Sequence, residues 1–577
     1  MISKLTSKLR TTNFQTLPLR SEPKAAASAK PRARAKIDCA RWAVRMITLV
    51  CAGLTVALTA HAVDPNWEVR KNAWTATDER NYASFISALG NSGCNTIATC
   101  LKNPANPYRG TDAAGSRFWS DCAKFPYLMR AYFAWKNSLP FSYVSAVEAV
   151  EGKGGDLRYS KLGNRPLARH DVINPGKPLD GMAAVNAMMD SVNTAMFRYD
   201  PSSDFKNGIG FDFYPVAVNR DALRPGSMIY DPNGHVAIIY KVEDDGRLRF
   251  FDAHPDNTVS HGVYGEKFVR SSPGMGAGFK NFRPLALLGA TATPSGDYIG
   301  GKVVAASNAQ LPSYSTEQFF GTNPVAGSWI KGTFAINGTP LDYYDFVRTR
   351  MAIGDLKYHP VEEMANGMDA LCQDLRDRVS AVDTSVKAGM DKRDHSTNLP
   401  SNIYGTDGDW ESFSSPSRDA RLKTSFRELR TNAEKFVALY NLHSPRIDYQ
   451  GTNLGSDLRA AYAKSAQACV ITYNRTDGSP VQMNFDEVQQ RLFKLSFDPY
   501  NCIELRWGAS STAELNTCRD NTTKLAWYDA EQFLRNQLDR SYDVPMGFSL
   551  PQLQAHVPGS GVAAGPDVDL RDYLKSL

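Results

Sequence analysis

The first regular hydrophobic pattern along the chain is helical. Phe125, Leu128, Met129 and Tyr132 recur at i, i+3, i+4 and i+7, which is the spacing of one apolar helix face. We therefore expect an amphipathic helix over this stretch, with one side buried against a core.

The pattern changes to that of strands at Met228. Short runs of β-branched and aromatic residues alternate with the turn sequences DPNG and EDDG, as is typical of strands joined by tight turns. These runs cover Met228–Tyr230, His235–Val242 and Leu248–Asp252. A helix followed by an antiparallel meander predicts an α+β domain.

From about residue 361 the apolar positions step by three or four again, as in helices. One such series is Met364, Met368, Leu371, Leu375, Val379, Val382 and Val386, and another is Leu422, Phe426, Leu429, Ala433, Phe436 and Tyr440. Two shorter helical patterns cover 485–495 and 525–538. Together they predict a helical domain of at least four helices.

These patterns divide the chain into four parts. We expect a leader at 1–62, an α+β domain at 63–300, a connecting segment at 301–360 and a helical domain at 361–577. The α+β domain is expected to contain an insertion at about 152–219, because this stretch is polar and includes GKGGD and NPGKP.

The leader resembles a signal peptide. Its apolar run, 46–60, is short for a membrane span, follows Arg41 and Arg45, and precedes Ala60-His61-Ala62. We expect cleavage after Ala62, export to the periplasm or the medium, and no membrane span in the mature chain.

Charge and cysteine content change with removal of the leader. The leader carries eleven Lys and Arg residues against two acidic ones, a net charge of +9, so the +6 of the whole chain becomes −3 in the mature part. Nucleic acid is therefore not expected as a partner. Seven of the nine cysteines remain, an odd number that leaves one unpaired in an oxidising compartment. We expect the pairs Cys94/Cys100, Cys372/Cys469 and Cys502/Cys518, with Cys122 left over.

Cys122 is the candidate nucleophile. Ser120 is placed to cap the helix that follows, so the thiol would lie in the first helical turn, where a thiolate is stabilised. The candidate base is His235, which opens a strand after a glycine turn. Asp252 or His254 on the neighbouring strand would orient the imidazole, and these two residues should point to the same face.

Four blocks of the sequence, in this order, resemble the NlpC-like members of the papain-like cysteine peptidases, which are related to CHAP amidases. They are Pro107–Gly110, Asp121-Cys122, Leu223–Gly226 with Met228–Tyr230, and Gly234–Tyr240. The resemblance implies a papain-like fold, a Cys122 nucleophile and a His235 base. It also implies Asp252 as third residue, with His254 as competitor, and Tyr108 and Asp121 as substrate-binding residues.

The resemblance predicts an exported cysteine endopeptidase or amidase that cleaves amide bonds of peptidoglycan peptides. The alternative is a catalytically inactive scaffold that binds a cell-wall peptide or another envelope protein. Its support is that Ala123-Lys124 and Ser227 depart from the family pattern. An acyltransferase with the same nucleophile stays open. We expect no cofactor and no metal, because the remaining histidines lack ligand spacing.

Overall fold

The computed structural model describes residues 65–577 except 153–154, 178, 201–208, 403–407, 414–415 and 539–545. The expected leader and its cleavage site lie outside these residues. All described residues belong to one compact unit, Ala60–Leu577, which combines helices with antiparallel sheets.

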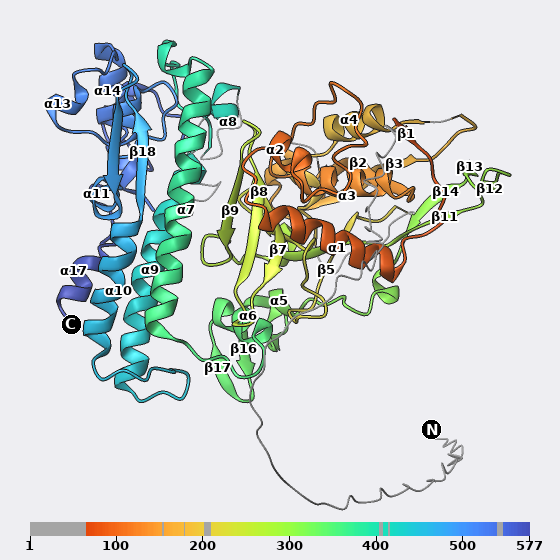
Figure 1. Cartoon of the computed structure of the whole chain (residues 1–577), viewed down its shortest axis with the longest axis horizontal. Coiled ribbons are helices and arrows are strands. Elements are labelled where there is room, and N and C mark those ends of the chain that lie inside the picture. Colours follow the sequence, from red (N-terminus) through yellow and green to blue (C-terminus); the bar gives the residue numbers. More distant parts are fainter. Residues whose placement is uncertain are drawn as a thin grey trace, which may run out of the picture. The chain divides into compact units, whose positions relative to one another are not determined.

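A six-stranded antiparallel sheet holds the predicted strands, in the order β5-β10-β6-β7-β8-β9 (Figure 1). Its members are β5 (Phe213–Pro215), β6 (Met228–Asp231), β7 (His235–Val242), β8 (Leu248–Ala253), β9 (Val259–Val263) and β10 (Gly278–Phe282). The three strand segments expected from the sequence are therefore confirmed as β6, β7 and β8. Asp231 faces His235 across the β6–β7 hairpin, and Gly234 supplies the positive φ of 91° that this turn requires.

The two faces of the sheet bury different side chains of β7. Val236 and Ile238 belong to a core shared with the N-terminal helices, whereas Ala237 and Ile239 belong to a core on the opposite face. This is the alternation expected of a strand covered on both sides. The N-terminal helices are α1 (Ala76–Asn91), α2 (Ile97–Lys102), α3 (Lys124–Lys136) and α4 (Gly181–Ser191).

Helix α3 confirms the predicted helix but not its one-sided burial. Every residue from Phe125 to Trp135 is buried, including Arg130. The Arg130 guanidinium lies 3.4 Å from the ring centre of Trp74 and pairs with Glu79. Because α1, α4 and the sheet all contact α3, it is a central helix, and its polar residue is satisfied inside the core.

The expected insertion at about 152–219 is part of the same core. Strand β3 within it pairs with β2 in an antiparallel ribbon, and Val172, Val185 and Phe197 are buried with α3. The further segments within this stretch are η1 (Leu157–Tyr159), β3 (Asn164–Val172), β4 (Leu179–Asp180) and η2 (Thr194–Met196), and their strands pair with β2 (Phe141–Ala149) and β1 (Asn66–Trp67) before it.

Small sheets and two helices complete the core on the second face of the main sheet, where Phe346 and Met351 pack with Ala237 and Ile239. The first of these segments are η3 (Pro273–Met275), β11 (Leu285–Leu288), β12 (Thr291–Ala292), β13 (Tyr298–Ile299), β14 (Lys302–Ala305) and η4 (Asn308–Gln310). They continue with α5 (Glu317–Phe320), β15 (Asn323–Val325), β16 (Ser328–Ile336), β17 (Thr339–Leu341) and α6 (Tyr343–Met351).

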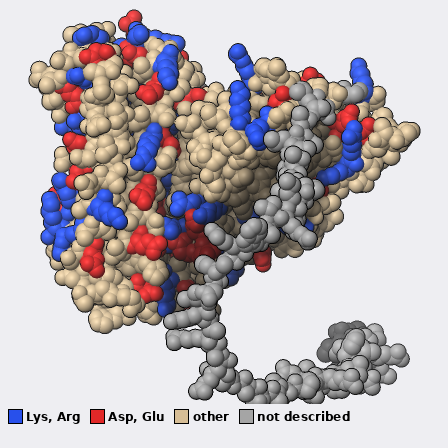
Figure 2. Space-filling model, in the orientation of Figure 1, with Lys and Arg blue, Asp and Glu red and all other residues tan. Residues whose placement is uncertain are grey.

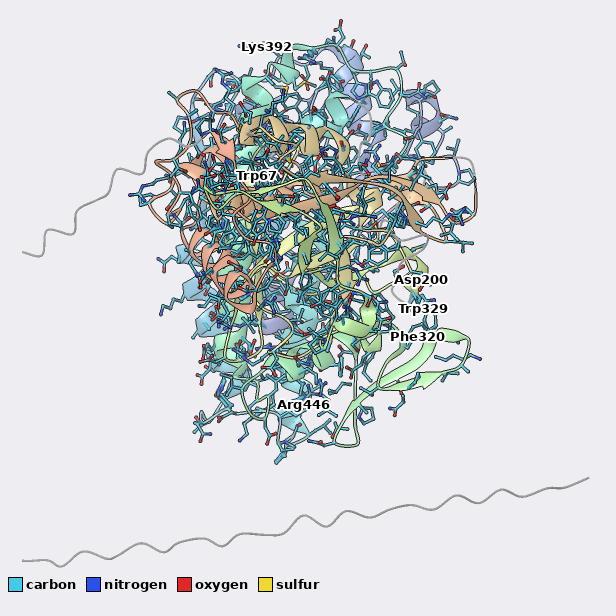
Figure 3. All side chains as sticks on the ribbon, turned by 90° about the vertical axis from the view of Figure 1, so that its right-hand side faces the viewer. Trp67, Asp200, Phe320, Trp329, Lys392 and Arg446 are labelled. Carbon is cyan, nitrogen blue, oxygen red and sulfur yellow. A yellow bond between two sulfur atoms is a disulfide. The ribbon has the colours of Figure 1, made fainter. Side chains whose placement is uncertain are left out.

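The C-terminal half contains the long helices predicted from residue 361. Lys392, just after α7, and Arg446, just after α9, lie at opposite ends of this half in Figure 3, as expected for antiparallel neighbours. The long elements are α7 (Pro360–Lys387), α9 (Pro416–Asn441) and α10 (Leu454–Ala468). The shorter ones are η5 (Met390–Lys392), α8 (Asp409–Phe413), β18 (Val470–Asn474), β19 (Pro480–Asn484), α11 (Phe485–Arg491), α12 (Ile503–Arg506), α13 (Thr512–Leu515), α14 (Thr522–Ala530), α15 (Gln532–Asn536), α16 (Leu550–Gln554) and α17 (Leu570–Lys575).

Helix α7 joins the helical half to the sheet by running beside β9 (Figure 1). Asp377 Oδ2 accepts the backbone N–H of His261 at 3.1 Å, and Lys267 Nζ lies 3.3 Å from Asp374 Oδ2. The helical half therefore covers one edge of the sheet.

Three disulfides join the cysteine pairs expected from the sequence: Cys94–Cys100, Cys372–Cys469 and Cys502–Cys518. Cys122 is the free cysteine among the described residues. Within the described part of the chain, the longest apolar helical stretches fall short of what crossing a membrane requires. Acidic and basic side chains are interspersed over the helical half in the face shown by Figure 2.

Candidate active site

Cys122 lies in the turn that leads into α3. The cap of this helix is Asp121, not Ser120, because Asp121 Oδ1 accepts the N–H of Lys124 at 2.9 Å. The Asp121 carbonyl also accepts the N–H of Phe125 at 3.0 Å. Ser120 instead donates its N–H to Asn257 Oδ1 at 2.9 Å. The thiol therefore lies at the start of the helix, as expected, but a different residue caps that helix.

His235 and Asp252 form a buried pair on neighbouring strands. His235 Nε2 lies 2.6 Å from Asp252 Oδ2, and their side chains are 6% and 5% exposed. The second oxygen of Asp252 accepts the hydroxyl of Ser260 at 2.9 Å, from the residue opposite it on β9. The carboxylate is therefore held on both sides, and one imidazole nitrogen of His235 is engaged.

His254 contacts Ser260 and Asp252 rather than the His235 imidazole. Its Nε2 lies 2.7 Å from Ser260 Oγ and 3.4 Å from Asp252 Oδ2. Its ring stacks near that of His235, with centroids 5.9 Å apart and an interplanar angle of 19°. Of the two candidates for a third residue, Asp252 contacts the His235 imidazole directly, and His254 shares the carboxylate.

The Cys122 sulfur contacts the backbone on both sides of His235. Sγ lies 3.6 Å from the carbonyl oxygen of Gly234, to which the thiol donates, and the backbone N–H of Val236 also bonds to the sulfur. Cys122 and His235 line one cavity of about 130 Å³. Since Nε2 of His235 is bound to Asp252, Nδ1 is the ring nitrogen that remains for another partner.

Before any reaction, the site favours the uncharged forms of the Cys122 thiol and the His235 imidazole. Burial raises the pKa of the Cys122 thiol to about 12, and the Asp121 and Asp252 carboxylates add to this effect. Burial and the Arg421 guanidinium lower the pKa of His235, although Asp252 opposes them. At neutral pH the pair is thus a thiol and a neutral imidazole. The thiolate expected from the helix start is not favoured, because the loss of water outweighs the helix terminus.

Asp252 stays ionised in the same surroundings. Its burial favours the neutral acid, but the charges of His254 and His235, the hydrogen bond from His235 and the Arg421 guanidinium hold the pKa of Asp252 below its usual range. A carboxylate held in this way can stabilise a positive charge on the imidazole.

The helical half supplies walls of the cavity that the sequence did not indicate. Glu411 from α8 and Arg418 and Arg421 from α9 line the cavity with Cys122. No local motif marks these residues, since they belong to helices almost 300 residues further along the chain. Ser260 was missed too, although it follows Asp252 across a short β8–β9 turn.

The region around the expected insertion supplies the opposite wall. Tyr159 and Asn193 line the cavity, and Arg158 Nη1 lies 3.0 Å from Glu411 Oε1. This ion pair joins the wall from η1 to the wall from α8. The cavity is therefore enclosed by segments from three distant parts of the sequence.

Tyr108 does not belong to the site. Its hydroxyl accepts Asn137 Nδ2 at 2.8 Å, at the far end of α3, and its ring packs against Phe85 and Tyr132. Asn137 follows Cys122 by fifteen residues, which corresponds to about 20 Å along a helix. The expected substrate-side tyrosine is instead part of the aromatic core, while Asp121 remains beside the sulfur.

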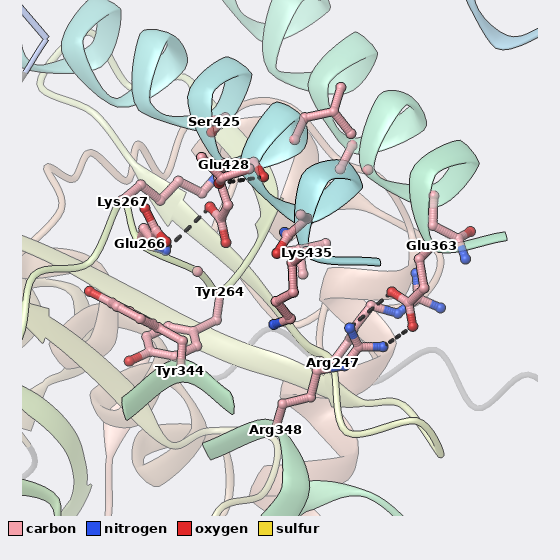
Figure 4. Close-up of a pocket in the computed structure, with 18 of the residues that line it drawn as sticks. Arg247, Tyr264, Glu266, Lys267, Tyr344, Arg348, Glu363, Ser425, Glu428 and Lys435 are labelled. Atoms are coloured by element: carbon pink, nitrogen blue, oxygen red, sulfur yellow. Dashed lines mark hydrogen bonds and ion pairs between the residues drawn. The ribbon is translucent and has the colours of Figure 1, made fainter. Parts of the chain in front are cut away.

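A larger cavity lies nearby, between the sheet edge and the helical half. Its volume is about 270 Å³, and Figure 4 shows Lys267 and Glu428 towards one end and Arg348, which bonds to Glu363, towards the other. Lys267 and Asp374 also line a small cavity that contains His235 and Asp252. A series of cavities thus follows the junction from the Cys122 site to Arg348.

Two other side-chain groups have metal-ligating atoms within 4.8 Å of one another among the described residues. One is Cys502, Cys518 and Asp520, whose cysteines are used in a disulfide. The other is His395, Asp498 and Glu531 in the helical half. Neither group lies at the Cys122 cavity.

Searches against protein-family models, curated proteins and solved structures found no match to this chain. The likeness to NlpC-like peptidases therefore rests on the four sequence blocks.

Proposed function

We propose that this protein is an exported cysteine hydrolase that cleaves amide bonds of peptidoglycan peptides, with a papain-like arrangement of its first half. Cys122 is the nucleophile, His235 the base and Asp252 the residue that orients the imidazole. The observation that carries the proposal is the contact series: Cys122 Sγ bonds to the backbone on either side of His235, and His235 Nε2 lies 2.6 Å from Asp252.

The first chemical step starts from the neutral pair. As Cys122 Sγ attacks the amide carbonyl, its proton passes to Nδ1 of His235, and Asp252 stabilises the imidazolium. The backbone N–H of Cys122 helps to stabilise the developing oxyanion. His235 then protonates the leaving amine, which departs and leaves a thioester on Cys122.

The second step restores the enzyme. His235 removes a proton from water, the resulting hydroxide attacks the thioester carbonyl, and the thiol leaves with the proton returned by the imidazole. An amine in place of water would give acyl transfer instead. Product analysis separates these reactions, since hydrolysis releases a free carboxylate.

The cavity is lined by charges of both signs, several of them paired. Asp121 pairs with Lys124 and Glu411 with Arg158, and Arg418 and Arg421 add positive charge. The excess of positive charge suits a carboxylate on a short peptide. The choice of a cell-wall peptide within this class rests on the family resemblance and on the expected export.

Peptidoglycan digestion by the purified chain tests this proposal. We expect wild type to release peptide fragments with new carboxyl or amino ends, detected by mass spectrometry, and Cys122→Ala and His235→Ala to lower the rate at least a hundredfold. His443→Ala, at an exposed histidine of the helical half, is the matched control and should keep full activity. Undiminished release by Cys122→Ala would contradict the proposal.

The second candidate is a non-catalytic envelope scaffold that binds a cell-wall peptide or protein in the same cavity. It is favoured by the neutral, partly buried thiol and by the helical half that covers the His235 face. On this alternative, the wild type binds peptidoglycan peptides without cleaving them, and Cys122→Ala binds them equally well.

A further inference from the structure

Three polar side chains meet inside the helical half, away from Cys122. His395 follows η5, Asp498 follows α11, and Glu531 lies between α14 and α15. Their ligating atoms lie within 4.8 Å of one another. The side chains of His395 and Asp498 are fully buried, and Glu531 is 0% exposed. Buried charge at this depth requires compensation.

The atoms that face one another lack hydrogen-bond partners. Both carboxylate oxygens of Glu531, Oδ2 of Asp498 and Nε2 of His395 are buried and accept or donate no hydrogen bond. The other polar atoms are satisfied: Asp498 Oδ1 accepts the N–H of Tyr500 at 2.8 Å, and His395 Nδ1 lies 2.5 Å from the carbonyl of Ser396. Four buried atoms without a hydrogen bond therefore converge on one point, and each costs free energy in this state.

The imidazole of His395 has the orientation of a metal ligand. Because a carbonyl oxygen can only accept, Nδ1 carries the proton, and in the neutral ring Nε2 presents a lone pair. A carbonyl partner of this kind fixes the ring of many metal-bound histidines. Nε2 lies 3.1 Å from Asp498 Oδ2. Two ligands of one ion at about 2.0–2.1 Å are separated by about 3.0–3.4 Å, so the spacing fits a shared ion.

The neighbouring cations, Arg535 and Arg506, do not satisfy the carboxylate. Arg535 Nη1 lies 3.6 Å from Glu531 Oε2, but it donates its hydrogen bond to the carbonyl of Tyr528 at 2.6 Å. Arg535 Nη2 donates to Gln532 Oε1 at 3.0 Å. Arg506 acts on Glu531 through its charge, while its Nε donates to the carbonyl of Ser496 at 3.1 Å. The two guanidinium groups thus lower the electrostatic cost without hydrogen-bonding to the carboxylate.

We propose that His395, Asp498 and Glu531 bind one divalent transition-metal ion, for which Zn²⁺ is the best match. An imidazole nitrogen with two carboxylate oxygens suits zinc, whereas calcium and magnesium favour all-oxygen sites. The ring of Trp527 stacks on His395 at 4.1 Å, with Tyr500 and Trp410 beside it. The ion is structural: it ties three loops of the helical half together inside an aromatic shell.

Sequence reasoning predicted no metal, because the three ligands are 103 and 33 residues apart and form no local motif. The site is independent of the proposed hydrolase activity. Cys122→Ser should therefore keep the metal whether or not that activity exists.

Zinc binding by the full chain tests the proposal. The protein is stripped with EDTA, dialysed and titrated with Zn²⁺ alone, and metal content is measured by mass spectrometry together with the thermal unfolding midpoint. We expect one equivalent of zinc in wild type and a rise of the midpoint. Glu531→Gln and Asp498→Asn, which keep the shape of the side chains, should weaken binding at least tenfold. His359→Ala, at an exposed histidine 4.0 Å from Asp448, is the control and should bind as wild type does.

Two results would overturn the proposal. One is equal zinc content in wild type and in both carboxylate variants. The other is a wild-type protein whose thermal unfolding midpoint does not change with zinc and which shows no visible absorption band when it is titrated with Co²⁺. This second readout needs no variant. The cluster would then be neutralised by a proton on Glu531, whose pKa is raised well above its usual value by burial and by Asp498.

Discussion

The imidazole of His235 is held by a single carboxylate, and this makes Asp252 the most informative residue to change. Asp252→Asn keeps the size of the side chain but loses the charge that stabilises an imidazolium, and its amide can favour the wrong tautomer. We expect kcat/KM for peptidoglycan peptides to fall by about a hundredfold or more, with unchanged far-UV circular dichroism.

Ser260→Ala serves as the control for Asp252→Asn. It removes the hydroxyl that donates to Asp252 Oδ1 but leaves the contact between His235 and the carboxylate in place. A small loss in Ser260→Ala with a large one in Asp252→Asn supports a role in orienting the base. Equal, small effects in both would show that His235 does not need the carboxylate.

The residues of the site differ in how well local sequence could locate them. Cys122, His235 and Asp252 follow from a helix start and two neighbouring strands, because strand alternation and hairpin register are local properties. Arg418 and Arg421 come from packing between distant helices and the sheet, which no local pattern encodes. Tyr108 shows the opposite case, in which an apparent motif residue is used for aromatic packing.

Helix α1 lies close to strand β7 at Gly90. A Cβ at this position would lie 2.1 Å from Cγ of Tyr240, so any side chain forces the helix and strand apart. Gly90→Ala should lower the free energy of unfolding by about 1–3 kcal/mol, measured by urea denaturation. Ser84→Ala on the exposed side of the same helix is the control, with a change expected within about 0.5 kcal/mol.

The secondary structure could be predicted where the hydrophobic period was long or repeated. The patterns of α7 and α9 extend over many turns, and β6 to β8 are bounded by clear turn sequences. The burial of α3 on all sides could not be read from its period, since it depends on what packs around the helix. The segments predicted at 485–495 and 525–538 form shorter helices, because capping and local turns end them early.

At the scale of the whole molecule, the junction between the sheet and the helical half contains a carboxylic acid, Glu428, with a raised pKa. Burial raises the pKa of Glu428 on α9 to about 7, Glu266 adds to this effect, and Lys267 and Lys435 oppose it. Between about pH 4.3 and 7 the folded form therefore binds more protons at Glu428 than the unfolded form does. Stability from this residue falls as the pH rises through that window and is constant above it.

Glu428→Gln should remove this dependence. The amide oxygen can still accept the N–H of Glu266, which Glu428 Oε2 accepts at 3.2 Å. We expect the variant to exceed wild type by about 1–3 kcal/mol at pH 8 and to match it near pH 4, measured as the free energy of unfolding. Glu434→Gln, at an exposed residue of the same helix paired with Arg430, should keep the wild-type pH dependence.

The cover that α7 places over β9 also sets an order of events during synthesis. β9 ends at Val263, whereas α7 begins at Pro360 and ends at Lys387. At about 5–20 residues per second, the ribosome needs roughly 6–25 s to make the chain from Val263 to Lys387. Throughout this interval the sheet edge carrying His261 has no helix to cover it, and Cys372 waits 97 residues for Cys469. The first half is therefore made with an uncovered strand edge, which can pair with other chains until the helical half follows.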